Sequence, residues 1–364
     1  MFLAGDVMTG RGIDQILPCA SEPRLFERYV RSALDYVALA EGVSGAFARR
    51  VPFSYIWGDA LAELERVRPD ARIVNLETAV TASDDAWPQK GIHYRMHPGN
   101  VPCLSAARLD CCVLANNHVL DWGYSGLAET LATLDRAGLR TAGAGRDAEE
   151  AAAPAIIERP GLGRVLVFAL ATEDSGVPRD WAAAPKRAGV CLLEDLSARG
   201  VEAVARRIAA HRRGGDLVVA SIHWGGNWGY GIASSQRAFA HGLIDAAGVD
   251  LVHGHSSHHA KGIEVHRERP ILYGCGDFIT DYEGIGGHEA FRPGLSLMYF
   301  PTLDLGTGRL LRLGMTPMRM RRLRVERASK EEAAWLCEAL GRECGRLGTR
   351  LESQPDATLA LRWN

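Results

Sequence analysis

The chain has 364 residues, of which 47% are hydrophobic and 24% charged, a composition typical of a globular protein with a sizeable core. Its 42 basic and 44 acidic residues give a net charge of -2, which argues against a broad electrostatic surface for nucleic acid or anionic membrane. Small-molecule chemistry at a local site is therefore favoured.

The chain starts MFLAGDVMTG, without a basic leader, and it contains no stretch of about 18 apolar residues. Its eight cysteines form no CxxC pair, and Cys111 and Cys112 lie in an apolar run that reads as a buried strand. A thiolate zinc site is not expected. The sequence predicts a soluble, cytoplasmic protein with reduced thiols and no integral membrane segment.

Short apolar runs alternate with longer amphipathic segments through most of the chain. Strands are predicted at MFLAG, ARIVNLET, CCVLANNH, RVLVFALAT, DLVVASIHWG and VDLVHGH, each ending in a polar or glycine-rich cluster. Helical spacing of apolar residues marks SGLAETLATLDRAGL, SARGVEAVARRIAAHRRGG and SSQRAFAHGLIDAAG, and the last two open on serine, a usual N-cap. This strand–helix alternation predicts an α/β core.

The C-terminal part has a different pattern. IEVHRERPILYGCGDF and LSLMYFPTLDLGTGRLLRLGMTPM are each expected to form a hairpin, the second turning through residues 306–308. A capping box at Ser329 and Glu332 begins a helix, and ATLALRW ends the chain as a strand. We therefore expect one domain over residues 1–327 and a C-terminal helix and strand appendage over residues 328–364.

Polar side chains stand at the carboxyl ends of the predicted strands, where the loops of α/β sheets build their sites. They are Asp6, Glu77, Asn117, His118, His223 and His255. The segment LVHGHSSHHAKG also holds four of the chain's 12 histidines. A set that mixes oxygen and nitrogen ligands favours Mn²⁺, Fe²⁺ or Zn²⁺ over Ca²⁺. The sequence predicts a site for one or two divalent transition-metal ions.

Five motifs occur in the order and approximate spacing of one protein family. They are GDVMTGRG, NLETAVT, ANNHVLDWG, SIHWGGNWGY and VDLVHGHSSHHAKGIEV. From about residue 2 to about residue 300 the chain resembles the CapA-type capsule and poly-gamma-glutamate biosynthesis proteins, which look like a branch of the calcineurin-like metallophosphoesterases. The resemblance implies a sandwich of two facing sheets flanked by helices, an α/β/β/α fold.

The resemblance also implies a role for each matching residue. The implied metal ligands are Asp6 and His258 for a first ion, Glu77 as a bridge, and Asn117, His223 and His255 for a second ion. His118 would stand beside the leaving group as a general acid, with Asp121 orienting it. Arg11 and Asn116 would contact the substrate or support the ligands.

Two departures from the family pattern concern the first ion. Met8 stands where calcineurin-like enzymes usually carry a histidine, two residues after the first aspartate, so that one ligand is missing. The usual GHxH ending becomes GHSSH over residues 254–258, with one extra residue. A site with one tight and one weak ion, or with a single ion, stays open.

Several further residues keep two interpretations. His253 either shares the site or does not, and His259 either supports it or is solvated. Asp277, in GCGDF, resembles a structural turn of the family and is expected at most to support the ligands. The segment HWGGNWGYG is either a loop packed by its own aromatic residues or a flexible loop over the substrate.

We therefore predict a divalent-metal-dependent hydrolase in which a metal-bound hydroxide attacks a phosphoester, or an amide or gamma-glutamyl bond, of a small or peptide-like substrate. The alternative is a non-catalytic, metal-binding accessory protein of envelope or poly-gamma-glutamate polymer synthesis. The chain contains neither a dinucleotide fingerprint nor a GxxxxGK[ST] motif, so NAD and ATP are not expected as cofactors.

Overall fold

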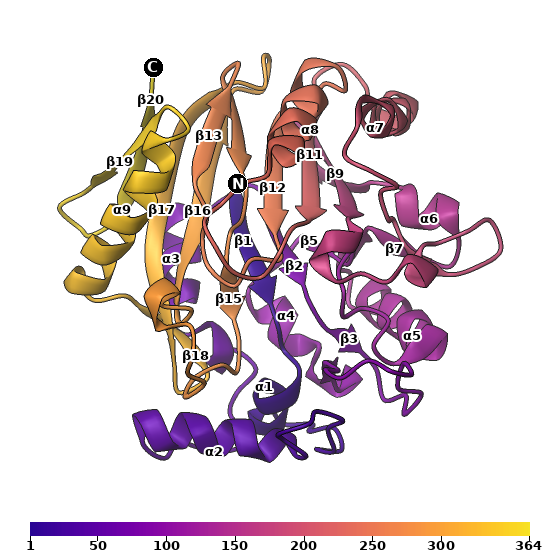
Figure 1. Cartoon of the computed structure of the whole chain (residues 1–364), viewed down its shortest axis with the longest axis vertical. Coiled ribbons are helices and arrows are strands. Elements are labelled where there is room, and N and C mark those ends of the chain that lie inside the picture. Colours follow the sequence, from indigo (N-terminus) through magenta and orange to yellow (C-terminus); the bar gives the residue numbers. More distant parts are fainter.

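The computed structural model describes residues 1–364 and contains two β-sheets packed face to face, with helices on their outer sides (Figure 1). The larger sheet has ten strands: β1 (Phe2–Val7), β2 (Arg72–Leu76), β5 (Cys111–Val113), β6 (Arg140–Ala142), β15 (Asp277–Ile279), β16 (Leu295–Leu303), β17 (Leu310–Arg321), β18 (Arg324–Arg327), β19 (Thr349–Ser353) and β20 (Leu359–Trp363). Their order is β19-β20-β17-β16-β1-β2-β5-β6, with β15 beside β1 and β18 beside β17.

The smaller sheet has six strands in the order β13-β14-β12-β11-β9-β8. Their bounds are β8 (Ala155–Arg159), β9 (Gly163–Ala171), β11 (Leu217–His223), β12 (Leu251–His255), β13 (Ile263–His266) and β14 (Arg269–Leu272). Two small sheets pair β3 (Ala79–Val80) with β4 (Arg95–Met96), and β7 (Ala144–Gly145) with β10 (Gly189–Val190). The predicted two-sheet α/β sandwich is confirmed, and each of the six predicted strands before residue 256 is present.

Nine helices complete the fold: α1 (Arg11–Ile16), α2 (Ala33–Ser44), α3 (Asp59–Val67), α4 (Pro102–Ala106), α5 (Gly123–Arg136), α6 (Ala148–Ala152), α7 (Ala198–His211), α8 (Ser234–Asp245) and α9 (Lys330–Gly345). Short 3₁₀ turns lie at 55–57, 98–100, 173–175, 179–181 and 289–291. Of the helices, none combines the length and the apolar character that crossing a membrane requires.

Alternation of buried side chains explains why the smaller sheet forms a layer. Val167 and Val219 belong to the main core between the sheets, whereas their neighbours in sequence, such as Val218, point to the other face and pack in a second core. That second core includes Val204 and Phe239, from α7 and α8, so these helices cover the outer face of the sheet (Figure 1). Each fully buried aliphatic side chain contributes about 1.5–3 kcal/mol.

Helix starts follow local capping chemistry. The Ser197 side chain accepts a hydrogen bond from the Arg199 amide, which confirms the predicted N-cap of α7. The predicted serine cap of α8 is wrong, because Ser234 is already helical and Gln236 instead accepts a hydrogen bond from the Ala233 amide at 3.2 Å. The capping box of α9 is confirmed. The Ser329 hydroxyl accepts a hydrogen bond from the Glu332 amide, and the Glu332 carboxylate accepts one from the Ser329 amide.

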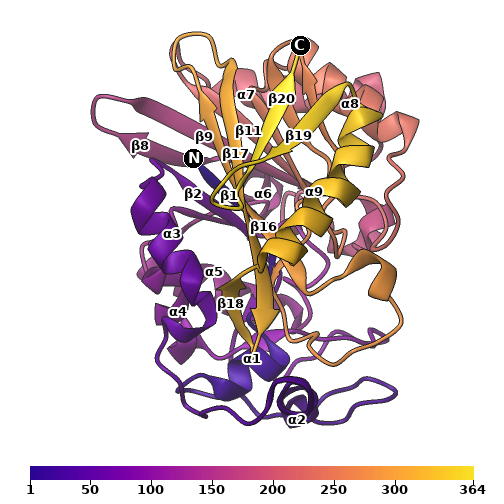
Figure 2. The same cartoon turned by 90° about the vertical axis from the view of Figure 1, so that its left-hand side faces the viewer.

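The C-terminal residues extend the larger sheet. Both predicted hairpins, β13–β14 and β16–β17, are confirmed, and β20 pairs with β17. Figure 2 shows α9 beside the β16–β17 hairpin, and Leu336 and Leu340 of this helix belong to the main core. The division at residue 327 into a domain and an appendage stays a prediction.

Candidate metal centre

Parallel strands of both sheets end at the same edge of the sandwich. β1, β2 and β5 run parallel in the larger sheet, and β9, β11 and β12 run parallel in the smaller one. A cavity of about 380 Å³ opens where their carboxyl ends meet, and its lining includes Glu77, Asn117, His118, His223 and His258. Residues far apart in the sequence are thus brought together at the ends of four strands, β2, β5, β11 and β12.

Two groups of side chains at this edge could each hold a cation. The first consists of Asp6, His223 and His255, and the second of Asp6, His258 and Asp277. Within each group, the atoms able to bind a metal lie within 4.8 Å of one another. Asp6 belongs to both groups, so the arrangement provides two adjacent positions that share one carboxylate.

Glu77 and the paired histidines face this shared carboxylate. His223 and His255 are direct partners in the β11–β12 register, with their Nδ1 atoms 2.8 Å apart. The Oε1 atom of Glu77 lies 3.9 Å from His223 Nε2, and His255 Nδ1 lies 3.9 Å from Asp6 Oδ1. The other ring nitrogen of His255 is 2.9 Å from the Ser221 hydroxyl, which fixes the orientation of the ring.

Three oxygen atoms at this edge are buried without a hydrogen-bond partner: Glu77 Oε2, Asn117 Oδ1 and Asp277 Oδ2. Leaving a buried polar atom unpaired costs about 1–3 kcal/mol, and native structures rarely gather several such atoms in one place. Carboxylate and amide oxygens beside imidazole nitrogens suit Mn, Fe or Zn ions. The residues present therefore fit a bound divalent cation.

The pKa shifts of the carboxyl and imidazole groups at this centre also support a bound divalent cation. Burial, followed by the nearby Asp277 carboxylate, raises the pKa of Asp6 to about 7, and burial beside Asp6 raises the pKa of Glu77 well above its usual range. Burial also lowers the pKa of His223 and His255 far below the ordinary value. Clustered carboxylates beside neutral imidazoles form the donor set that a cation needs.

His118 and Asp121 lie at the rim of the same cavity. The His118 Nδ1 atom is 2.6 Å from Asp121 Oδ2, which leaves Nε2 to face Glu77 Oε1 at 3.8 Å. The backbone amide of Tyr94 also donates to Asp121 Oδ2, at 2.6 Å. The sequence-predicted pair is therefore brought together, with the carboxylate holding the ring and the ring directed at the ligand group.

Lys90 joins this pair, although sequence reasoning missed it. Its ammonium group donates to Asp121 and, at 2.6 Å, to the backbone oxygen of Asn117. Burial lowers the pKa of Lys90, and its side chain is 16% exposed and lines the cavity. Nothing in the segment QKGIHYR marks this lysine, because its partners lie about thirty residues further along the chain.

Asn116 supports the loop that carries His118. Its amide nitrogen donates to Leu76 and Asn75, and its side-chain oxygen accepts from the backbone amides of His118 and Val119. The side chain of Asn75 in turn donates to Asp6 Oδ1 at 2.8 Å. One amide network thus connects the Asp6 carboxylate with the loop carrying His118.

The structure does not bring Arg11 into the cavity. Its guanidinium is 3% exposed and donates to both carboxylate oxygens of Asp281, to Glu27 and to the Tyr36 hydroxyl. The same group stacks on the rings of Tyr36 and Tyr94. These contacts give the Arg11 side chain a structural role, and a substrate contact of Arg11 stays a prediction.

The structure shows where the other two histidines of the LVHGHSSHHAKG segment, His253 and His259, lie and what they contact. His253 is fully buried, with Nε2 2.9 Å from the Ala4 backbone oxygen and Nδ1 3.0 Å from Ser221, so it connects the two sheets below the site. His259 is 2% exposed and stacks on Phe291 at 4.6 Å between ring centroids. The solvated interpretation of His259 is therefore wrong.

The extra residue in GHSSH is accommodated by an unusual backbone conformation. Ser256 has a φ of 96°, which a residue with a side chain rarely adopts. Its hydroxyl donates to Gly225, and the next turn of chain lets the His258 amide donate to Asn227 at 3.0 Å. The chain thus turns at Ser256 after the end of β12, and this turn places His258 in the lining of the cavity.

The HWGGNWGYG loop lies against a second aromatic segment beside the cavity. Trp228 stacks on His288 with ring centroids 3.7 Å apart, and Tyr230 packs on Phe291 at 5.4 Å. Asn227 of the same loop lines the cavity. The loop is therefore packed by aromatic residues, of which two come from residues 288–291 rather than from the loop itself.

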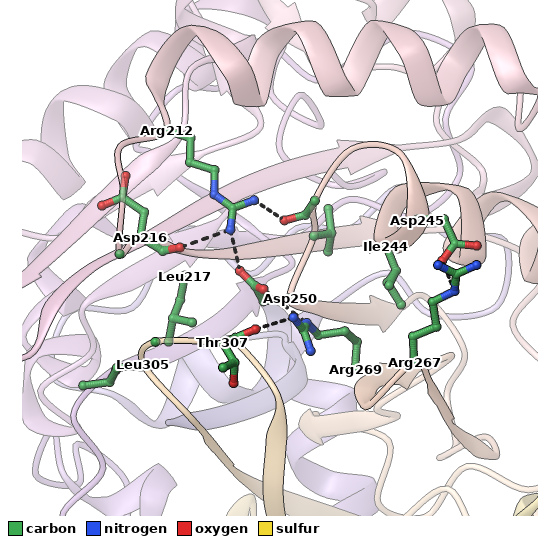
Figure 3. Close-up of a pocket in the computed structure, with 15 residues that line it drawn as sticks. Arg212, Asp216, Leu217, Ile244, Asp245, Asp250, Arg267, Arg269, Leu305 and Thr307 are labelled. Carbon is green, nitrogen blue, oxygen red and sulfur yellow. Dashed lines mark hydrogen bonds and ion pairs between the residues drawn. The ribbon is translucent and has the colours of Figure 1, made fainter.

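A second charged hollow, at the opposite ends of β11 and β12, is neutralised by its own residues (Figure 3). Asp250 accepts hydrogen bonds from Arg269 and from the Val218 amide, and lies 3.5 Å from Arg212. Arg269 also donates to the Thr307 backbone oxygen, in the turn of the β16–β17 hairpin. Arg269 thus attaches the hairpin turn to the smaller sheet, and each arginine that lines the hollow is paired with an aspartate.

The fold and the site define a two-sheet α/β protein with a candidate centre for divalent cations at the strand ends. Residues 1–282 match the sequence profile of the bacterial capsule synthesis protein family, PGA_cap. The chain belongs to this family, which confirms the resemblance to CapA-type proteins.

Individual relatives agree with this membership. A probable polyglutamine synthesis accessory protein of Mycobacterium tuberculosis is 49% identical over 362 residues, which cover 99% of this chain and 95% of the relative. The capsule biosynthesis protein CapA of Bacillus anthracis is 25% identical over 281 residues, covering 77% of this chain and 59% of the relative. The PGA biosynthesis protein CapA of Bacillus subtilis is 28% identical over 209 residues, covering 57% and 52% respectively.

Proposed function

We propose that the protein is a divalent-metal-dependent hydrolase that cleaves a phosphoester, or an amide or gamma-glutamyl bond, of a small or peptide-like substrate. One observation carries this proposal: His118, held by Asp121, directs its free ring nitrogen at a cluster of buried carboxylates and neutral imidazoles that could hold a cation. A proton-transfer group beside a cation site is the arrangement that hydrolysis of such bonds requires.

The proposed ligands are Asp6, Glu77, Asn117, His223, His255 and His258, which would hold one or two Mn, Fe or Zn ions. Such ions, when bound, polarise the bond to be cleaved and lower the pKa of a nearby water molecule, so that it can act as a nucleophile at neutral pH. The ligand groups themselves are held in place by second contacts, such as Ser221 on His255 and Asn75 on Asp6.

The His118 ring would move the proton. Burial, with a further contribution from Lys90, lowers the pKa of His118 well below its ordinary value and favours the neutral ring. The contact of Nδ1 with Asp121 Oδ2 places the remaining proton on Nδ1 and leaves Nε2 free. An anionic group of the substrate near Nε2 would favour the charged ring, because an opposite charge stabilises the imidazolium. Nε2 could then take a proton from solvent and deliver it to the departing oxygen or nitrogen, while Asp121 accepts a hydrogen bond from Nδ1.

The relatives suggest where such a reaction would occur. Their names refer to polyglutamine, capsule and PGA synthesis, and we propose that the bond cleaved belongs to a precursor or fragment of a glutamate polymer. A second candidate function is a non-catalytic accessory role in polymer synthesis. It is favoured by the name of the mycobacterial relative and by Met8, which removes one expected ligand of the first ion.

Elemental analysis of the purified wild type beside His255→Ala and Glu77→Ala tests the centre before any substrate is chosen. We expect one or two transition-metal ions per chain in the wild type and a loss in both variants. A wild type that holds no ion after reconstitution with Mn²⁺ or Zn²⁺ contradicts the proposal.

A substrate panel then separates the two candidate functions. It contains an aryl phosphate, a phosphodiester and gamma-glutamyl peptides of several lengths, each assayed with added Mn²⁺ or Zn²⁺. Turnover that is abolished by EDTA and by His118→Ala supports the hydrolase. An ion-loaded protein that turns over none of these compounds, and that co-purifies with a polymer synthase, supports the accessory role.

A further inference from the structure

Asp277 lies directly beside the aspartate shared by the two cation positions. It opens β15, which pairs with β1 so that Asp277 and Asp6 are register partners. The approach depends on Gly5, where an added Cβ would lie 1.8 Å from the Gly276 oxygen. Asp277 is 2% exposed, and its Oδ1 atom lies 2.9 Å from His258 Nδ1.

The second oxygen of Asp277 is buried without any partner. A comparison with Asp281, four residues along, shows that this is unusual for a structural aspartate here. Asp281 uses both oxygens, accepting from the Arg11 guanidinium and from the Gly12 amide. Because an unpaired buried carboxylate oxygen is costly, a purely structural role leaves the position of Asp277 Oδ2 unexplained.

Met8, the place of the missing ligand, follows β1 beside β15, and its backbone amide donates to the Ile279 oxygen at 2.8 Å. Met8 is 2% exposed, and its sulfur lies 3.6 Å from the Tyr282 hydroxyl, while Tyr282 lines the cavity. The thioether therefore reaches the edge of the centre, but it is a soft, neutral group that binds hard divalent ions weakly. The first position needs another donor, and Asp277 is the carboxylate that the fold brings there.

We propose that Asp277 is a ligand of the first ion in place of the histidine that Met8 replaces, and that the two positions consequently prefer different metals. The first position would be rich in oxygen, with Asp6, Asp277 and Glu77 beside one nitrogen of His258. The second would be richer in nitrogen, with His223 and His255.

Ligand hardness decides the preference. Carboxylates suit harder ions such as Mn²⁺, whereas imidazoles suit Zn²⁺ equally well or better. The first position should therefore discriminate less strongly against Mn²⁺ than the second. This inference rests on the proposed metal centre, but it concerns ion content and selectivity and needs no turnover.

The test compares metal-free wild type, Asp277→Asn and Asp121→Asn after reconstitution with Mn²⁺, by elemental analysis and by the electron paramagnetic resonance of bound Mn²⁺. Asp121 is the matched control, because it is a buried carboxylate at the same edge that contacts His118 and Lys90 rather than the ligand group. We expect two ions in the wild type and the control. Asp277→Asn should keep one ion and bind the other at least about tenfold more weakly.

Asp277→Asn that keeps two ions at wild-type affinity overturns the inference, and so does a wild type that holds a single ion. A wild type without any ion instead contradicts the proposed function, so the two failures are distinguishable. Unfolding in EDTA shows whether the variant is intact. We expect a melting temperature close to that of the metal-free wild type, because asparagine preserves the shape of the side chain.

A second measurement needs no variant. Mn²⁺-loaded wild type is titrated with Zn²⁺, and bound Mn²⁺ is followed by its resonance signal. We expect two separate displacement steps, with at least about tenfold more Zn²⁺ needed for the second. Displacement of all bound Mn²⁺ in one step overturns the proposed difference between the positions.

Discussion

The Nδ1 atoms of His223 and His255 lie 2.8 Å apart across two paired strands, at the end of a ladder in which every residue has a partner. Two ladder steps earlier, Ser221 and His253 form the corresponding pair, and their side chains are 3.0 Å apart. The same strand face therefore carries a ligand pair at the edge and a structural pair below it. The position of a pair along the two strands therefore decides whether it can bind a metal at the edge or supports the structure below the edge.

His253→Ala should destabilise the protein and leave the metal centre formed. The substitution removes a buried ring that is hydrogen-bonded to Ser221 and to the Ala4 backbone oxygen, at an expected cost of about 2–4 kcal/mol in unfolding free energy. His255→Ala should abolish or strongly weaken ion binding. Urea unfolding with and without Mn²⁺, together with ion content, checks both variants. Loss of the ions in folded His253→Ala protein would contradict the division of roles.

The metal-free protein should carry a pH-dependent penalty at Asp6. Burial raises the pKa of this carboxyl from 3.8 to about 7, so between these values the folded state binds more protons than the unfolded state. The free energy of unfolding consequently falls as the pH rises through this interval. At about 1.4 kcal/mol per pKa unit, the full effect is at most about 4 kcal/mol.

The comparison with Asp6→Asn isolates this effect, because the amide does not titrate. In EDTA, the stability of the variant relative to the wild type should increase as the pH rises from about 4 to about 7, and should level off above that. Denaturant unfolding at a series of pH values measures the difference. A difference that stays constant over this range would show that Asp6 titrates normally in the folded protein.

Much of the fold could be predicted from the sequence because its central strands are apolar, regularly spaced and followed by polar ends. The strands that were missed are short, such as β3 and β7, or belong to pairings whose partners are far away, such as β15 with β1. Two-residue strands have no periodicity to detect. The predicted serine cap of α8 was wrong because Ser234 is already inside the helix, and the Gln236 side chain accepts a hydrogen bond from the Ala233 amide at its start.

The candidate site was predictable to the extent that its residues stand at strand ends. Asp6, His223 and His255 follow this rule, and the structure brings them together. Lys90 and Asp277 do not follow it. Lys90 comes from a loop without regular structure, and Asp277 reaches the site at the start of its strand, through the pairing of β15 with β1. Their roles depend on tertiary contacts that no local pattern encodes.

Asp121→Asn should reduce turnover and leave the ions in place. Asparagine can still occupy the position, but it cannot accept a charge-assisted hydrogen bond from the His118 ring, which is then less well oriented. We expect kcat to fall about 10²-fold, with little change in KM. Steady-state kinetics on a substrate identified from the panel, with Asp135→Asn on the exposed face of α5 as a control, checks this. Unchanged kcat in Asp121→Asn would remove the residue from the proton-transfer machinery.

Lys90→Met should move the acidic limb of the pH–rate profile to higher pH. Burial raises the pKa of Asp121 to about 6, and Lys90 opposes this rise through its charge and its hydrogen bond. Without the ammonium group the carboxylate should hold its proton to a higher pH, so a larger fraction of the enzyme lacks the charged partner of His118 near neutrality.

Lys90→Arg is the matched control for this prediction, because it keeps the positive charge while changing the shape of the group. The profile of kcat against pH should show an acidic limb in the same place for wild type and Lys90→Arg, and a shifted limb for Lys90→Met. Ion content should be equal in all three proteins, since Lys90 contacts Asp121 and the Asn117 backbone and none of the proposed ligand atoms. An acidic limb that does not move in Lys90→Met would show that the ionisation of Asp121 does not limit the rate.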